Sequence, residues 1–175
     1  MCKGPDELQR AVSSRPTAAY NALGTYFAQR KRLSCAESAF QSPLSLDPNS
    51  PEARYNLGLA LLSEGKPERA ANEFRSASSL QPRLPRMHAG LGQALSSLHQ
   101  TDAAIREFQT ALNIDPNFVP ALGGLAEALI DEKRYSAAIA CLQNAPADET
   151  LRIDLGLDIR AMETLKRPFG RCRTW

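Results

Sequence analysis

The chain has 175 residues, of which 43% are hydrophobic, and a formal net charge of +2. This much apolar residue with so little charge excludes an intrinsically disordered chain, and no apolar run reaches the roughly 18 residues of a membrane span. The first ten residues do not resemble a secretory signal, so we expect a folded, cytoplasmic protein that does not enter a membrane.

The predicted elements follow one another at a fixed interval of 34 residues. The chain begins with a partial repeat over residues 6–16, which resembles the second half of the later repeats. Full repeats are predicted over 17–50, 51–84 and 85–118, and a fourth, with a shortened final link, over 119–148. A partial repeat or capping helix over 149–165 and a basic tail over 166–175 complete the chain. We expect residues 1–165 to form a single array.

The interval is defined by matching residues in successive repeats. Within a repeat, large or apolar residues fall at spacings of 0, 3, 4 and 7, which is one face of an α-helix. The second half of each repeat shows a similar stripe, so each repeat is predicted to be two helices that bury their apolar faces by stacking. The matching sets are Tyr20, Leu23, Gly24, Phe27; Arg54, Leu57, Gly58, Leu61; His88, Leu91, Gly92, Leu95; Ala36, Ala70, Ala104; Phe40, Phe74, Phe108; and Pro48, Pro82, Pro116.

Local signals mark the helix ends. Ser34 with Glu37 fits a capping box, and Ser50 before Pro51 fits a cap followed by a first-turn proline. Gly65 is expected to separate two helices. An interior Pro43 is expected to kink or shorten the second helix of the first repeat.

A glycine column runs through the first helices, although glycine inside a helix costs about 1 kcal/mol relative to alanine. We expect close helix packing to compensate, with Gly24, Gly58 and Gly92 facing the small alanine column that begins at Ala36. On this interpretation, small residues facing small residues set the distance between paired helices.

Cysteine and histidine spacing predicts no chemical site. Cys2, Cys35, Cys141 and Cys172 lie far apart, which predicts neither a zinc cluster nor a disulfide framework. One alternative makes Cys2 the acylated start of a mature lipoprotein. His88 and His99 have no adjacent catalytic pattern. We therefore predict a protein that is not an enzyme, with no catalytic, metal-binding or cofactor-binding residues.

These columns resemble the tetratricopeptide repeat, a 34-residue unit with a large residue, Leu-Gly, an aromatic residue and later Ala, Phe, Ala and Pro. The first column departs from the usual tryptophan, since it holds Tyr20, Arg54, His88 and Leu122, and Pro43 replaces an expected alanine. The resemblance implies an all-α, right-handed α-solenoid of stacked helix-turn-helix repeats with about ten helices. It also implies a protein-protein interaction scaffold that binds a peptide or protein segment in a concave groove.

The resemblance places the groove on the helix face opposite the buried columns. Small residues there leave room for an inserted chain, and a few large ones offer anchors of the kind that dominate interfaces. For the apolar members, packing against the neighbouring repeat is an equally weighted alternative. The candidate groove residues are Asn21, Thr25, Tyr55, Asn56, Leu59, Arg86, Gln93, Glu127, Asp131, Ile153 and Leu157.

Two specialised grooves of the family do not fit. The clamp for a chaperone carboxyl terminus needs lysine, asparagine and arginine at set positions, of which only Asn56 is identical and only Arg86 is similar in charge. The asparagine ladder of glycosyl-transferring relatives retains Asn56 alone.

Three alternatives concern partners. Nucleic acid is not expected, because the tail supplies the excess of positive charge and the candidate groove carries more acidic than basic residues. The chain could instead be an interaction module cut from a larger protein, such as an enzyme whose catalytic part lies outside it. Self-association through the C-terminal helix is a further expectation, because Leu151, Leu155, Ile159 and Met162 share one face.

Overall fold

The structure of the protein is a computed structural model that describes residues 2–143. These residues form nine α-helices and no β-strand, which confirms the predicted all-α class of helical repeats. The chain divides into two compact units, Met1–Pro82 and Arg83–Trp175. None of the described helices is long and apolar enough to cross a membrane.

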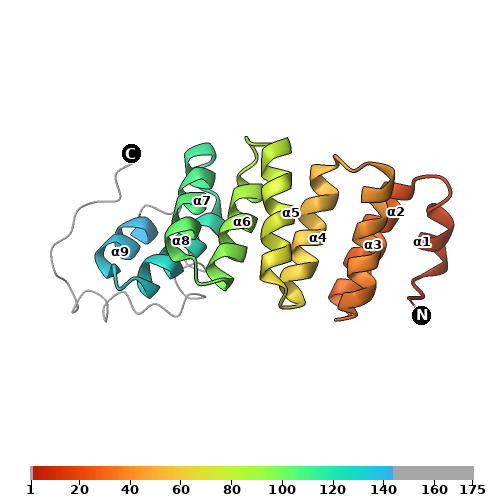
Figure 1. The fold of residues 1–175 in the computed structure, drawn as a ribbon, viewed down its shortest axis with the longest axis horizontal. Helices are drawn as coiled ribbons and strands as arrows, with labels where there is room; N and C mark the ends of the chain where they lie inside the picture. The colour runs from red at the N-terminus through yellow and green to blue at the C-terminus, as the bar shows by residue number, and fades with distance from the viewer. Residues whose placement is uncertain (1, 144–175) are drawn as a thin grey trace. The chain divides into compact units, whose positions relative to one another are not determined.

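The N-terminal unit consists of one short helix and two helix hairpins. Its helices are α1 (Asp6–Ala11), α2 (Pro16–Gln29), α3 (Leu33–Leu46), α4 (Pro51–Ser63) and α5 (Pro67–Leu80). Helix α2 pairs with α3, and α4 pairs with α5, as Figure 1 shows. Contacts of α4 with α3 and α2 stack the second hairpin on the first, and α1 packs against α2.

The C-terminal unit repeats this arrangement. Its described helices are α6 (Pro85–Ser97), α7 (Thr101–Ile114), α8 (Val119–Asp131) and α9 (Tyr135–Gln143). Helices α6 and α7 form one hairpin and α8 and α9 form the next, with α8 packed against both α6 and α7 (Figure 1).

The four turns between paired helices share one conformation. Each places a single residue in the left-handed region, namely Lys31, Gly65, His99 and Lys133, with φ between 56° and 71°. In the second repeat, the Gly65 amide donates to the Leu62 carbonyl and the next amide donates to Leu61, which is a Schellman motif. The other three turns make the same pair of bonds. Only one of the four residues is a glycine, although all four need its conformation.

Two of the predicted helix signals have different outcomes. The Ser50 cap is confirmed, because its side chain accepts a hydrogen bond from the Ala53 amide. The Ser34–Glu37 capping box is wrong: α3 begins at Leu33 without any side-chain cap. Glu37 instead binds cations of the following repeat.

Pro43 does not shorten its helix, contrary to the prediction. Helix α3 has 14 residues, the same length as α5 and α7. The proline lies in the last turn, where few hydrogen bonds depend on it, and its ring is fully buried. Its carbonyl still accepts a bond from the Asp47 amide, so the helix ends in the normal way.

The glycine column faces phenylalanine, not alanine, so the prediction of small residues facing small residues is wrong. A β-carbon at Gly24 would lie 2.5 Å from the ring of Phe40, and one at Gly92 would lie 2.7 Å from the ring of Phe108. The rings are buried, at 5% and 2% exposure. Glycine is needed because each ring lies flush against the backbone of the preceding helix.

The expectation that no cysteines pair is also wrong. Cys2 and Cys35 form a disulfide with a Cα–Cα distance of 5.5 Å. Among the described residues no cysteine is a free thiol, since Cys141 is disulfide-bonded as well. Cys2 and Cys35 meet because the start of the chain folds back across α2 to reach α3, which sequence spacing alone does not reveal.

Candidate functional site

The first helix of each repeat exposes one stripe of residues. The ninth position of every repeat is exposed, and so is the thirteenth, four residues later along the same helix face. The ninth-position residues are Thr25, Leu59, Gln93 and Glu127, and the thirteenth-position residues are Gln29, Ser63, Ser97 and Asp131. This exposed stripe contains candidate groove residues of the sequence analysis, and its chemistry differs between the two units.

In the N-terminal unit the stripe lies on α2 and α4 and is nearly uncharged. Leu59 is one of the large apolar side chains that remain exposed, at 38%. Asn56 and Tyr55 beside it are half-buried, and Glu52 at the start of α4 is exposed. Because α2 and α4 contact each other, the structure brings Asn21 and Thr25 to the same part of the unit as the α4 residues.

Tyr55 has a structural role as well as a partly accessible side chain. Its ring meets the ring of Phe74 edge to face, with centroids 5.6 Å apart and planes at 62°. Such pairs stabilise by about 1 kcal/mol beyond burial alone. Substitutions of Tyr55 therefore affect the fold unless the ring is kept.

The two candidate residues on α2 present few hydrogen-bonding groups to a ligand. The Thr25 hydroxyl donates to the Asn21 carbonyl at 3.0 Å, a bond within the helix that leaves its oxygen free to accept. The Asn21 side-chain oxygen is buried and has no hydrogen-bond partner among the described residues. In this conformation that oxygen is covered, so Asn21 does not present it to a ligand.

In the C-terminal unit the stripe lies on α6 and α8 and is more acidic. Gln93, Glu127 and Asp131 are exposed, while Arg86 is half-buried. Gly124 does not form an open notch, because a β-carbon there would clash with the ring of Phe108. The remaining candidates, Ile153 and Leu157, lie outside the described residues, as does the helix expected to mediate self-association.

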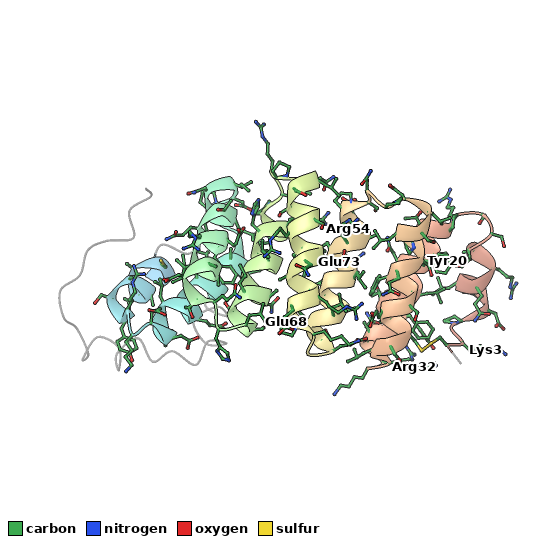
Figure 2. The ribbon with its side chains drawn as sticks, viewed as in Figure 1. Lys3, Tyr20, Arg32, Arg54, Glu68 and Glu73 are labelled. Atoms are coloured by element: carbon green, nitrogen blue, oxygen red, sulfur yellow. A yellow bond between two sulfur atoms is a disulfide. The ribbon has the colours of Figure 1, made fainter. Side chains whose placement is uncertain are left out.

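Two polar pairs link paired helices, and one member of each pair, Arg54 or His88, lies in a column that was predicted to be buried. The Nη1 atom of Arg54 lies 2.9 Å from Oε2 of Glu73, and Nδ1 of His88 lies 2.9 Å from Oε2 of Glu107. Figure 2 shows Arg54 on α4 and Glu73 on α5 pointing toward one another. Both pairs are 19 residues apart, so their common spacing in successive repeats was a signal that could have revealed them.

His88 consequently has a carboxylate partner that the sequence analysis did not find. In the first and fourth repeats the corresponding positions hold Tyr20 with Ala39 and Leu122 with Cys141. The central repeats therefore use a polar pair where the outer repeats use less polar residues. The repeated geometry indicates a structural pairing of helices, since the same arrangement occurs with arginine in place of histidine.

Glu37 lies at the centre of a charge cluster in the N-terminal unit. Its two oxygens lie 2.8 Å from Lys66 Nζ and 2.7 Å from Arg69 Nη2, which join the first repeat to the second. Lys66 also binds Glu64. Hydrogen bonding by Lys66, reinforced by Arg69 against the opposing effect of burial, lowers the pKa of Glu37 to about 2. The same contacts raise the pKa of Lys66.

The described residues contain no group of three or more histidine, cysteine or acidic side chains able to hold a metal ion. A shallow hollow at the α6–α7 turn is bordered by His99, Asp102, Arg106 and Glu132. Its walls are polar and open to solvent.

Comparison with known families agrees with the helix pairs and their columns. Residues 22–85 and residues 95–155 each match a family model described as tetratricopeptide repeat. Together the two spans cover more than half of the chain, so the chain belongs to the tetratricopeptide repeat family. Among curated protein sequences, none matches significantly.

Solved structures show the same fold. TTC0263, a tetratricopeptide repeat protein of Thermus thermophilus, is similar with a TM-score of 0.73 at 20% identity over 85% of each chain. YrrB, described as having an unusual peptide-binding site, gives 0.70 at 16% identity over 94% of this chain and 84% of its own. The second repeat domain of human RPAP3, solved with an HSP70 peptide, gives 0.61 at 20% identity over 64% of this chain and 93% of its own. At these identities the likeness concerns the fold.

Proposed function

We propose that the protein is a non-enzymatic interaction scaffold that binds an extended peptide or protein segment on the stripe of α2 and α4. The observation that carries this proposal is the exposed Leu59 beside the half-buried Tyr55 and Asn56. Exposed apolar residues next to an amide suit a peptide, because a side chain can cover the leucine while the amide binds the peptide backbone. Two fold relatives with peptide-binding sites support the class of ligand.

The charge of the stripe favours a peptide over a nucleic acid. In the N-terminal unit the stripe carries no charge, and Glu52 lies on the same helix as Leu59 and Ser63. In the C-terminal unit the charged residues of the stripe are Glu127 and Asp131. A nucleic-acid surface would need clustered lysine and arginine to neutralise phosphates. We therefore propose a partner segment that is apolar or basic, bound chiefly by the N-terminal unit.

The proposal is tested by selecting binders from a displayed library of random peptides and measuring their affinity by fluorescence anisotropy. Tyr55→Ala is expected to weaken binding by about 2 kcal/mol, or about 30-fold, whereas Tyr55→Phe keeps the ring on Phe74 and loses less. Lys133→Ala, in an exposed turn, and removal of residues 166–175 serve as controls and should change affinity little.

A photo-crosslinking residue locates the ligand independently of affinity. Placed at Thr25 or Leu59 it should capture the peptide, and placed at Arg75, a residue of α5 outside the stripe, it should not. Crosslinking from residue 75 alone, or loss of binding on changing the turn or the tail while stripe variants bind normally, would show that the stripe is not the binding surface.

A further inference from the structure

The start of the chain is held against the first hairpin by a covalent bond. We call residues 2–5 the strap. Cys2 in the strap is exposed, whereas Cys35 on α3 is buried at 7% exposure, and the disulfide joins them across a sequence separation of 33. The bond therefore has one end that solvent reaches and one end in the core.

The strap covers an apolar part of α2. A β-carbon on Gly4 would clash with Leu23 and would lie 3.4 Å from the ring of Phe27, so the strap backbone lies directly on these two buried side chains. Arg32 donates a hydrogen bond from Nη1 to the Lys3 carbonyl at 3.4 Å. Figure 2 shows Lys3 and Arg32 at the same end of the hairpin as the yellow disulfide bond.

The noncovalent attachment of this region is weak. Helix α1, which follows the strap, has six residues and none of them is buried. The hydrogen bond from Arg32 to the Lys3 carbonyl is exposed. The bond from Gln9 to the Gly4 carbonyl at 3.2 Å is exposed too, and it joins two residues of this region to each other and not to the hairpin. Because exposed hydrogen bonds exchange readily with water, ordering residues 2–15 depends largely on the covalent link.

We propose that the Cys2–Cys35 disulfide is a redox-controlled latch that holds residues 2–15 as a cap over Leu23 and Phe27. Opening the latch releases the cap and exposes these apolar side chains at the end of the first hairpin. The reductant is a dithiol protein or small molecule, and the exposed Cys2 sulfur is the atom that it reaches.

The exchange balances as an ordinary dithiol–disulfide reaction. One thiolate of the reductant bonds to Sγ of Cys2, the Cys2–Cys35 bond breaks, and Cys35 leaves as a thiolate that takes a proton from solvent. The second thiol of the reductant then displaces Cys2 and forms the reductant's own disulfide. Two electrons and two protons pass to the protein, which gains two thiols.

The test measures amide exchange and trypsin cleavage of the full chain with and without dithiothreitol under native conditions. Opening the latch should speed exchange over α1 at least about 10-fold. It should also speed trypsin cleavage after Arg10, because the Arg10 side chain is exposed and the released segment can enter the protease. Re-oxidation should restore protection. Without any reductant, the Cys2→Ser variant should show the same fast exchange and cleavage as the reduced protein.

Cys141→Ser is the matched control, because it removes a disulfide cysteine of the C-terminal unit. This variant should leave exchange over α1 unchanged when no reductant is present. Three results would overturn the proposal: free Cys2 in the oxidised protein by mass spectrometry, a disulfide that dithiothreitol does not reduce while the protein stays folded, or equal protection of residues 2–15 before and after reduction.

Discussion

Gly58 of α4 lies against the ring of Phe74 of α5, so that a β-carbon at residue 58 would be 2.7 Å from ring atom Cε1. Phe74 is fully buried, and its other neighbours include the ring of Tyr55. A densely packed core does not yield space without strain. The low helix propensity of glycine is thus offset by the packing of an aromatic ring against bare backbone.

Gly58→Ala is therefore expected to destabilise the protein by roughly 2 kcal/mol, because overpacking the Phe74 ring outweighs the gain in helix propensity. Gly123→Ala on α8 is the matched control, since a β-carbon there meets nothing within 4 Å. It should stabilise by up to about 1 kcal/mol. Urea unfolding followed by circular dichroism measures the free energy of unfolding of both variants. A change of the same sign in the two variants would contradict the packing argument.

The left-handed turn residues give a second prediction. His99→Gly is expected to stabilise by about 1 kcal/mol, because residue 99 has φ of 57° and glycine adopts this conformation without steric cost. Gly65→Ala should lose a similar amount; a β-carbon at Gly65 meets nothing within 4 Å, so only the backbone conformation is tested. Thermal melts of both variants test this prediction. An unchanged melting temperature for each variant would show that the turn conformation does not affect stability.

The Glu37 cluster predicts an acid-dependent loss of stability. The pKa of Glu37 is lowered from 4.5 to about 2 in the folded protein, so its stabilising contribution is complete above pH 4.5 and disappears as the pH falls toward 2. Glu37→Gln should cost roughly 2 kcal/mol at pH 7 and should flatten this part of the stability profile. Urea unfolding between pH 2 and 7 measures how the free energy of unfolding changes with pH.

Glu68→Gln provides the control, because Glu68 is a carboxylate near the same turn that lies outside the Glu37 cluster. Its substitution should leave the acid limb of the profile as in the unmodified protein. If Glu37→Gln and Glu68→Gln give the same profile, the contacts with Lys66 and Arg69 do not stabilise the fold.

Pro43→Ala is expected to stabilise by about 1 kcal/mol. Alanine restores an amide that can bond to the Ala39 carbonyl, which recovers part of the roughly 3 kcal/mol cost of helical proline, but it removes buried ring carbons worth about 0.8 kcal/mol each. Pro48→Ala, at an exposed position after the helix, should not raise the melting temperature. A fall in the Pro43→Ala midpoint would show that the buried ring matters more than the missing hydrogen bond.

The sequence predicted what depends on local pattern. The 34-residue columns predicted the helical repeat class, and Ser50 and Gly65 marked a helix start and a turn where the structure has them. Local pattern misled where a distant partner competes: Glu37 looks like a capping residue, yet its cations lie 29 and 32 residues further along the chain.

The packing partners and the covalent links could be identified only from the folded structure. Each of the first three repeats holds both an alanine and a phenylalanine in its second helix, and periodicity alone does not tell which one touches the glycine. The pairing of Cys2 with Cys35 depends on the path of the strap, which no repeat column encodes. The composition of the candidate stripe was predictable, but the edge contact of Tyr55 with Phe74 and the covered oxygen of Asn21 were not.

The ring of Phe108 has consequences for how the C-terminal unit unfolds. It packs against Gly92 in its own repeat and against Gly124 in the next, so one side chain is wedged between two successive first helices. Neither helix can leave without opening a void around the ring. Unfolding in this unit is therefore shared between neighbours, and the third and fourth repeats should melt as one cooperative block and not one after the other.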